Sequence, residues 1–258
     1  MASALELRSE RERPVGKPPE IAAVCLDIDD TLVDFTSAAR SALFTLIGRD
    51  DMWPAWQHTT DEYVARAVAG ELDPTTMRMQ RTKAFLTDMG VLLDDETVQV
   101  LEDRRLTEMN RGWQLFADAL PCLDWMRAAG LKLAAVTNAS GPAQRDKLAG
   151  LGLTRFFDAV VIAGEVGVAK PDPEIFHTAC QELHVEPSSA VHVGDRLDLD
   201  AIGARDAGLH AVWLNREDDE ADERTPQDVQ VIGDLTELPS LLVSEYVTPS
   251  MGVPQPRG

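Results

Sequence analysis

The sequence predicts an α/β protein in which helices cover both faces of a parallel β-sheet and an all-helical segment is inserted near the N-terminus. Three observations indicate this fold. Short apolar runs alternate with helical segments over residues 113–240, polar residues follow several of these runs directly, and residues 34–112 have helical periodicity without a strand run. The 258 residues, 44% of them hydrophobic, suffice for one core with an inserted module.

The apolar runs are expected to form the central sheet. The first, at 21–28, is rich in β-formers, too short for a helix and followed by acidic residues, as is typical of a buried parallel strand. Further strands are expected at 131–137, 159–163, 190–193, 210–214 and, at the edge, 229–232. Connecting helices are expected at 120–129, 142–150, 173–183 and 200–207. Units of this kind form a three-layer, Rossmann-like sheet with right-handed crossovers.

The chain is expected to have four parts. Residues 1–20, rich in Arg, Glu and Pro and without the apolar block of a secretory signal, are expected to be a flexible tail. The core comprises 21–33 and 113–240, the helical insertion 34–112, and a C-terminal tail 241–258. Helices of the insertion are expected at 37–47, 60–68, 74–88 and 95–110.

Composition excludes several classes of partner. A formal net charge of −20 argues against nucleic acid or an anionic membrane as a partner, since both are polyanions. The apolar stretches are too short to cross a bilayer, which takes about 20 residues. Three cysteines without a CxxC pair indicate neither a disulfide framework nor a zinc site. We expect a cytoplasmic protein, and the sequence leaves its oligomeric state open.

Acidic residues follow two of the predicted strands. Asp27 and Asp29 come where the first strand ends, and Asp195 follows the apolar run that ends at Val193. The carboxyl ends of parallel strands meet at one edge of a sheet, so these carboxylates are expected to converge. Such a cluster requires a cation, and oxygen ligands favour Mg²⁺. An acidic loop that caps a helix is the alternative for an isolated DxD motif.

Two further strand ends carry groups suited to phosphate. Thr137 and Asn138 follow the second strand, where a hydroxyl and an amide can donate hydrogen bonds to phosphate oxygens, although the pair is also ordinary turn chemistry. Lys170 follows the third strand and is stiffened by Pro171, although a lone lysine is usually a solvated surface charge. Four such signals in one chain favour a shared site.

These four segments together resemble the motifs of the haloacid dehalogenase (HAD) superfamily, in the branch with a helical C1-type cap inserted after the first motif. The likeness covers residues 21 to about 215. The DxDx[TV] motif stands at Asp27, Asp29 and Thr31. The later motifs match Thr137, Lys170 and an acidic pair formed by Asp195 with Asp200.

The resemblance implies a Mg²⁺-dependent phosphatase acting on a small phosphorylated metabolite. Asp27 would attack phosphorus and become an aspartyl-phosphate, and Asp29 would protonate the leaving oxygen and then activate water. Thr137 and Asn138 would hold phosphoryl oxygens, and Lys170 would pair with Asp27 and the phosphate.

The metal site is implied in the same way. Asp27, the backbone carbonyl of Asp29, and Asp195 would bind Mg²⁺, while Thr31 and Asp200 would support these ligands from behind. Asp198 is the alternative to Asp200 as the second acid of the last motif.

Other activities stay open at this stage. A phosphomutase would share the same core and the same intermediate. A 2-haloacid dehalogenase would share the nucleophile, the lysine and the cap but needs neither a metal nor an acid. A binding protein with an inactive core is a third alternative.

The insertion is expected to read the part of the substrate that is not phosphate. Trp53 and Trp56 are expected in a loop between its helices. Cationic candidates for an anionic leaving group are Arg40, Arg66, Arg78, Arg81 and Lys83. The sequence does not select which of these contact substrate.

Overall fold

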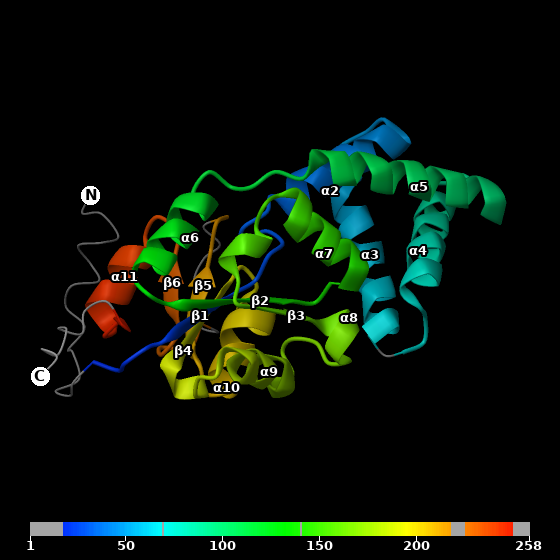
Figure 1. The fold of residues 1–258 in the computed structure, drawn as a ribbon. Helices are drawn as coiled ribbons and strands as arrows, with labels where there is room; N and C mark the ends of the chain where they lie inside the picture. The colour runs from blue at the N-terminus through cyan, green and yellow to red at the C-terminus, as the bar shows by residue number, and fades with distance from the viewer. Residues whose placement is uncertain (1–17, 69, 140, 218–224, 250–258) are drawn as a thin grey trace, which may run out of the picture.

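The computed structural model describes residues 18–68, 70–139, 141–217 and 225–249 (Figure 1). Most of the predicted N-terminal tail, residues 1–17, lies outside the described residues, as do residues 218–224 and 250–258. Within the described ranges, no helix combines the length and the apolar character needed to cross a membrane.

The predicted fold class is confirmed, because the chain forms a parallel sheet between layers of helices. The sheet order is β3-β2-β1-β4-β5-β6, and every neighbouring pair is parallel. The strands are β1 (Ala23–Leu26), β2 (Lys132–Thr137), β3 (Ala159–Ile162), β4 (Ala190–Gly194), β5 (His210–Leu214) and β6 (Gln230–Ile232). The chain order reverses between β1 and β4, and in open sheets of this type ligands bind at that point, beyond the carboxyl ends of the strands.

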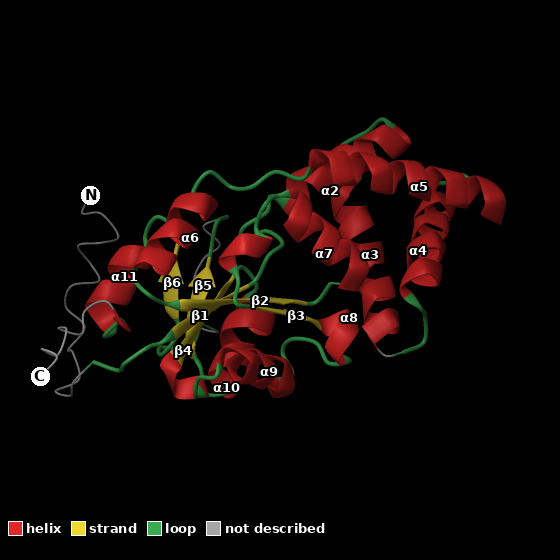
Figure 2. Cartoon of the chain, in the orientation of Figure 1, coloured by secondary structure: helices red, strands yellow, loops and turns green. Residues whose placement is uncertain are grey.

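Helices cover both faces of the sheet (Figure 2). Alternate residues of β1 point to opposite faces: Val24 and Leu26 pack into one apolar core, and Ala23 and Cys25 into the other. The first core is covered by α6, α7 and α11, the second by α9 and α10. Both faces are therefore buried, which explains the continuous apolar runs in the sequence. The helices after the insertion are α6 (Ala119–Ala128), α7 (Gly141–Gly150), α8 (Ala163–Val166), α9 (Pro173–Leu183), α10 (Gly203–Asp206) and α11 (Leu238–Glu245).

The insertion forms four helices beside the carboxyl ends of the strands (Figure 1). Aspartates cap three of them: the side chains of Asp34, Asp73 and Asp94 accept hydrogen bonds from backbone N–H groups of the first turn. The helices are α2 (Phe35–Ile47), α3 (Trp53–Val68), α4 (Pro74–Asp88) and α5 (Asp95–Gly112). They enclose a small apolar core of their own, in which Leu43, Trp56, Phe85 and Leu86 are buried.

The chain enters and leaves the insertion side by side. Val33 and Leu115 form an antiparallel bridge, and the backbone N–H of Asp34 donates to the carbonyl of Gln114 over 2.9 Å. The entry depends on a sharp turn at Asp30, whose φ of 58° lies in the left-handed region. The carboxylate of Asp30 stabilises this turn by accepting hydrogen bonds from the N–H and hydroxyl of Thr36, both over 2.8 Å.

Two expectations about the elements are wrong. The loop expected around Trp53 and Trp56 is helical, because α3 begins at Trp53 and Pro54 lies in its first turn, where its missing N–H costs nothing. The C-terminal tail was expected from residue 241, but α11 continues to Glu245 and buries Leu242 completely.

The N-terminal tail expected at residues 1–20 also includes residues that pair with another part of the chain. Glu20 forms a parallel bridge with Val247, and Val247 donates its backbone N–H to the carbonyl of Pro19 over 2.9 Å. Residues from both ends of the described chain therefore pair with each other.

Candidate active site

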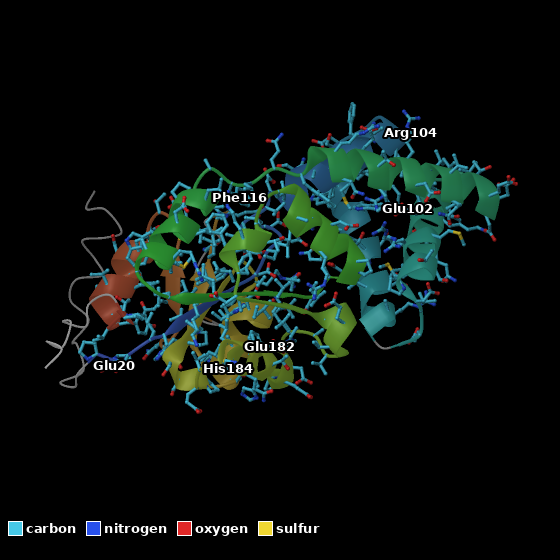
Figure 3. All side chains as sticks on the ribbon, in the orientation of Figure 1. Glu20, Glu102, Arg104, Phe116, Glu182 and His184 are labelled. Carbon is cyan, nitrogen blue, oxygen red and sulfur yellow. The ribbon has the colours of Figure 1, made fainter. Side chains whose placement is uncertain are left out.

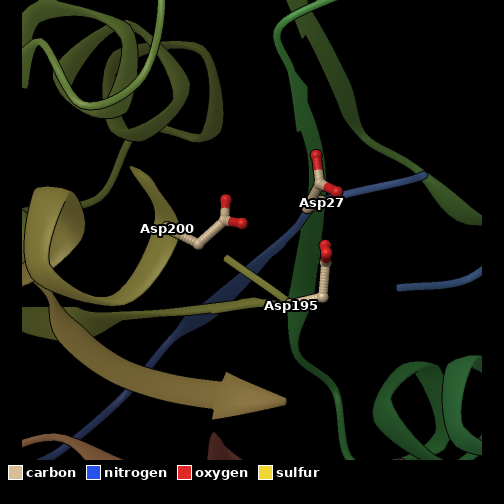
Figure 4. Close-up of side chains that lie close together, drawn as sticks. All are labelled: Asp27, Asp195 and Asp200. Carbon is tan, nitrogen blue, oxygen red and sulfur yellow. The ribbon is translucent and has the colours of Figure 1, made fainter. Parts of the chain in front are cut away.

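The carboxylates of Asp27, Asp195 and Asp200 converge beyond the ends of β1 and β4 (Figure 4). Each offers an oxygen, and these atoms lie within 4.8 Å of one another. The register produces this convergence: Leu26 pairs with Val193, so the residues that follow the two strands emerge next to each other. The backbone N–H of Asp27 also donates to the carbonyl of Val193 over 2.9 Å, which ties the two strand ends together.

Lys170 occupies the centre of this cluster. Its Nζ donates to Oδ1 of Asp27 and to Oδ1 of Asp200, both over 2.6 Å, and to the backbone carbonyl of Val136 over 3.0 Å. These three bonds use all the N–H groups of the ammonium. Burial would lower the pKa of Lys170, but the Asp200 and Asp27 carboxylates raise it above its usual range, so the side chain is charged.

The cluster carries an excess of negative charge. Burial, together with repulsion from the carboxylates of Asp200 and Asp29, raises the pKa of Asp27 to about 7 against the opposing effect of Lys170. Burial likewise raises the pKa of Asp195 to about 8, with Asp27 and Asp200 adding repulsion. Three carboxylates and one ammonium leave two negative charges, which is the charge that one divalent cation neutralises.

Asp200 is the acid that stays ionised. It is buried, which would raise its pKa, but Lys170 and His192 lower the pKa below its usual range. Nε2 of His192 lies 2.9 Å from Oδ1 of Asp200, and the backbone N–H of Arg196 donates to Oδ2 over 3.1 Å. Burial lowers the pKa of His192, so we assign a neutral imidazole that donates from Nε2. Both carboxylate oxygens of Asp200 are therefore occupied by protein donors.

Gly194 makes room for this acid. The residue is the last of β4. A Cβ at position 194 would overlap the carboxylate of Asp200, so the close approach of the two segments requires a residue without a side chain.

The loops that hold the acids are fixed by hydrogen bonds from several directions. The hydroxyl of Thr31 donates to Oδ1 of Asp195 over 3.2 Å, and Nε1 of Trp213 donates to the carbonyl of Asp195 over 2.9 Å. Arg216 connects the carbonyl of Thr31 to the carboxylate of Asp118. These contacts keep Asp195 facing Asp27.

Thr137 lies in the same cavity, and its hydroxyl accepts a hydrogen bond from Nε2 of Gln144 over 3.2 Å. Its own O–H hydrogen is therefore available for an oxygen of a ligand.

Asn138 was expected to hold a phosphoryl oxygen, and its side chain contacts the backbone of Lys170. Its amide donates to the carbonyl of Lys170 over 2.9 Å and its oxygen accepts from the N–H of Lys170 over 2.7 Å, so it positions the lysine loop.

Asp29 has partners that the sequence did not indicate. Its Oδ1 lies 2.6 Å from Nζ of Lys147 in an ion pair, and Nε2 of Gln144 lies 3.4 Å from its Oδ2. Lys147 is buried, and its Nζ lies 5.1 Å from the ring centre of Phe35 and 5.0 Å from that of Trp113. One sequence signal could have indicated these two partners of Asp29. Gln144 and Lys147 are three residues apart, which places both polar side chains on one face of the helix that follows Thr137.

Asp198 and Asp200 differ sharply in environment. The side chain of Asp198 is 64% exposed and pairs with Arg196, whereas that of Asp200 is 1% exposed and pairs with Lys170. Only Asp200 is placed to act on the cluster.

A cavity of about 830 Å³ extends from these acids to the helical insertion. Of the cationic candidates on the insertion, Arg40, Arg66 and Lys83 form ion pairs with Asp50, Glu71 and Asp95, and none of these three lines the cavity. Arg78 and Arg81 do line it, together with Arg105, Trp53 and Trp56.

Comparison with known proteins places these residues in context. The family model for haloacid dehalogenase-like hydrolases matches residues 21–208. A glyceraldehyde 3-phosphate phosphatase of Methanopyrus kandleri is 33% identical over 210 residues, which is 76% of this chain and 84% of that protein. An N-acylneuraminate-9-phosphatase of Mus musculus is 28% identical over 248 residues, 90% of this chain and 98% of that protein.

Solved structures share the architecture. The crystal structure of a HAD hydrolase from Bacillus subtilis, bound to magnesium, superimposes with a TM-score of 0.73 at 23% identity and covers 86% of this chain and 99% of its own. At this identity the likeness concerns the fold.

Proposed function

The chain belongs to the haloacid dehalogenase-like hydrolase family, and from this premise we propose that it is a magnesium-dependent phosphatase acting on a small phosphorylated metabolite. One observation carries the proposal: Asp27, Asp195, Asp200 and Lys170 form a largely buried cluster at the switch point of the sheet, with two negative charges left over. The relatives reported above act on phosphomonoesters according to their names, which supports the same substrate class here.

The donor set fits Mg²⁺. The ligands offered are carboxylate oxygens, and Asp200 already satisfies its oxygens with protein donors. We therefore assign the ion to Asp27, Asp195 and the backbone carbonyl of Asp29, as the family resemblance implies, with Thr31 and Asp200 behind them. When bound, the cation would neutralise the two carboxylates and withdraw charge from a phosphoryl oxygen.

Asp27 is assigned as the nucleophile. Lys170 holds Oδ1, and within the described residues Oδ2 has no hydrogen-bond donor, so one oxygen is left for attack on phosphorus. The bond that forms joins this oxygen to phosphorus, and the bond that breaks joins phosphorus to the ester oxygen. Thr137 would donate its hydroxyl hydrogen to the phosphoryl group, and Lys170 would act through its charge because all its N–H groups are engaged.

Asp29 is assigned as the acid and then the base. It would protonate the departing ester oxygen, and in the second step it would take a proton from the water that hydrolyses the aspartyl-phosphate. In this structure Lys147 holds Asp29 in an ion pair. Protonation of the leaving oxygen therefore requires Asp29 to separate from Lys147 and take up a proton from solvent, and the released ammonium can then bind a phosphoryl oxygen.

The insertion at 34–112 is assigned as a cap over the site. It contributes the far end of the cavity, so it would exclude water from the first step and read the leaving group. The net charge of −20 and the three free, buried cysteines support a cytoplasmic protein whose partner is a small molecule and not nucleic acid.

The test is hydrolysis of p-nitrophenyl phosphate with Mg²⁺. We expect turnover that EDTA abolishes, a loss of at least about 1,000-fold in Asp27→Asn, and little change in Asp198→Asn, which removes the same charge from an exposed position. Hydrolysis that persists in Asp27→Asn or in EDTA would refute the proposal. Phosphate release without a sugar acceptor distinguishes a phosphatase from a phosphomutase.

A further inference from the structure

The cavity is much larger than a phosphoryl group requires. Its volume of about 830 Å³ falls in the range that encloses whole metabolites, and its far end is built from the cap. Beside that end lies a cluster on α4 and α5 that the proposed chemistry does not use, and two of its arginines, Arg81 and Arg105, line the cavity. Its members are Arg81, Thr82, Glu102 and Arg105, all of them buried.

Glu102 is the centre of this cluster. Its Oε1 accepts from Nη2 of Arg105 over 2.7 Å and from Nη2 of Arg81 over 2.9 Å. Its Oε2 accepts from Nε of Arg105 over 2.8 Å and from the hydroxyl of Thr82 over 2.7 Å. Figure 3 labels Glu102 on α5, whereas Arg104, also labelled, is exposed to solvent.

The two arginines are not equivalent. Arg105 binds Glu102 through two parallel hydrogen bonds, which compensates the charge of the carboxylate. Arg81 makes a single bond to Glu102, and its buried Nε has no partner among the described residues. A buried guanidinium with unused donors is costly unless an anion completes it. Burial, together with the nearby Arg105, lowers the pKa of Arg81 to about 9 although Glu102 opposes this, as expected for surplus positive charge.

Trp56 holds Arg81 in place. The guanidinium carbon of Arg81 lies 4.4 Å from the centre of the Trp56 ring, and Trp56 is fixed in turn by an edge-to-face contact with Phe85 at 5.1 Å. Both Arg81 and Trp56 line the cavity. The donor group is thus oriented before any ligand arrives, which reduces the entropy lost on binding.

The surplus charge selects the ligand. The cap end of the cavity has three arginines, at 78, 81 and 105, against the carboxylates of Asp61 and Glu102, which leaves one positive charge. A carboxylate carries one negative charge and matches the planar donors of arginine, whereas a second phosphate would leave an uncompensated charge. We propose that Arg81 binds a carboxylate of the substrate, so that the preferred substrates are phosphomonoesters of organic acids. This inference rests on the proposed phosphatase function and names its substrate class.

The test compares matched pairs of phosphomonoesters that differ only in a carboxylate. Suitable pairs are 3-phosphoglycerate with glycerol 3-phosphate, and 6-phosphogluconate with sorbitol 6-phosphate, which span two chain lengths. The measured quantity is the ratio of kcat/KM for acid over alcohol on one enzyme sample. This ratio cancels differences in the folded fraction, so it stays meaningful for a variant that folds poorly.

We expect the wild type to prefer the acid in at least one pair by about tenfold or more, the effect of a hydrogen bond to a charged group. Arg81→Met should reduce this ratio to near one, and Arg81→Lys should restore part of it. The matched control is Arg66→Met, which removes an exposed arginine paired with Glu71 and should leave the ratio unchanged.

The outcomes separate the two proposals. If p-nitrophenyl phosphate is hydrolysed but no pair shows a preference for the acid, or if Arg81→Met keeps that preference, the carboxylate site is refuted and the phosphatase stands. If the wild type hydrolyses no phosphomonoester with Mg²⁺, the proposed function itself fails, and with it the inference about its substrate.

Discussion

Removing one carboxylate from the acidic cluster should stabilise the metal-free protein at high pH. In Asp195→Asn the amide keeps a hydrogen-bond acceptor for Thr31 but cannot ionise. The folded-state pKa of Asp195 is raised to about 8 from 3.8, mainly by burial. Because the pKa is higher in the folded state, the contribution of Asp195 to stability is fully present below its unfolded pKa of 3.8. This contribution is lost as the pH rises from there through about 8.

The magnitude follows from the same shift. A pKa near 8 in the folded chain against 3.8 in the unfolded chain corresponds to at most about 6 kcal/mol at pH 9. Water penetration and relaxation of the loop reduce such penalties, so we expect Asp195→Asn to gain about 2 kcal/mol over the wild type at pH 9 without metal. For a chain of this size that is a rise of about 4–8 °C in Tm.

The assay is thermal unfolding in EDTA at pH 6 and pH 9, repeated with Mg²⁺. The control is Asp198→Asn, which makes the same change in net charge at an exposed side chain and should not reproduce the gain. With Mg²⁺ the order should reverse, because the ion binds and stabilises only the wild-type cluster. A Tm for Asp195→Asn at or below that of the wild type at pH 9 in EDTA would show that the carboxylates do not repel each other in the way described.

Three further outcomes are expected. Gly194→Ala should lower the free energy of unfolding by about 2 kcal/mol, because its Cβ would overlap Asp200, whereas Gly150→Ala, at a helix end with open space, should be neutral or stabilising in the same denaturant titration. Asp200→Asn should reduce kcat about 10- to 100-fold, since it removes one of the two carboxylates that hold Lys170; an unchanged kcat would contradict that role. No halide should be released from 2-chloropropionate without metal, as measured by ion chromatography, and release would favour a dehalogenase.

The sheet and its connecting helices could be predicted because burial on both faces leaves a direct trace in the sequence. The run from Ile21 to Leu26 is apolar throughout, and the polar residues begin at Asp27, directly after β1 ends. Parallel topology then brings the ends of β1 and β4 together without any knowledge of side-chain contacts. For this reason Asp27, Asp195 and Lys170 could be assigned to one site.

The remaining site residues depend on packing that periodicity does not encode. Asn138 has the chemistry of a phosphate ligand, and only the fold shows that its side chain bonds to the backbone of Lys170. Lys147 lies on a helix with no motif, and its ion pair with Asp29 joins segments 118 residues apart. The same limit applies to Arg81 and Glu102, whose contact depends on how α4 packs against α5.

The proposed mechanism passes through a covalent phosphoryl group on Asp27, and this group can be trapped chemically. The enzyme is mixed with substrate and Mg²⁺, quenched within milliseconds, reduced with borohydride to convert an acyl phosphate into homoserine, and mapped by mass spectrometry. We expect homoserine at position 27 in the wild type and in Asp29→Asn, and none in Asp27→Asn. Turnover without any modified residue, or modification at a position other than 27, would contradict it.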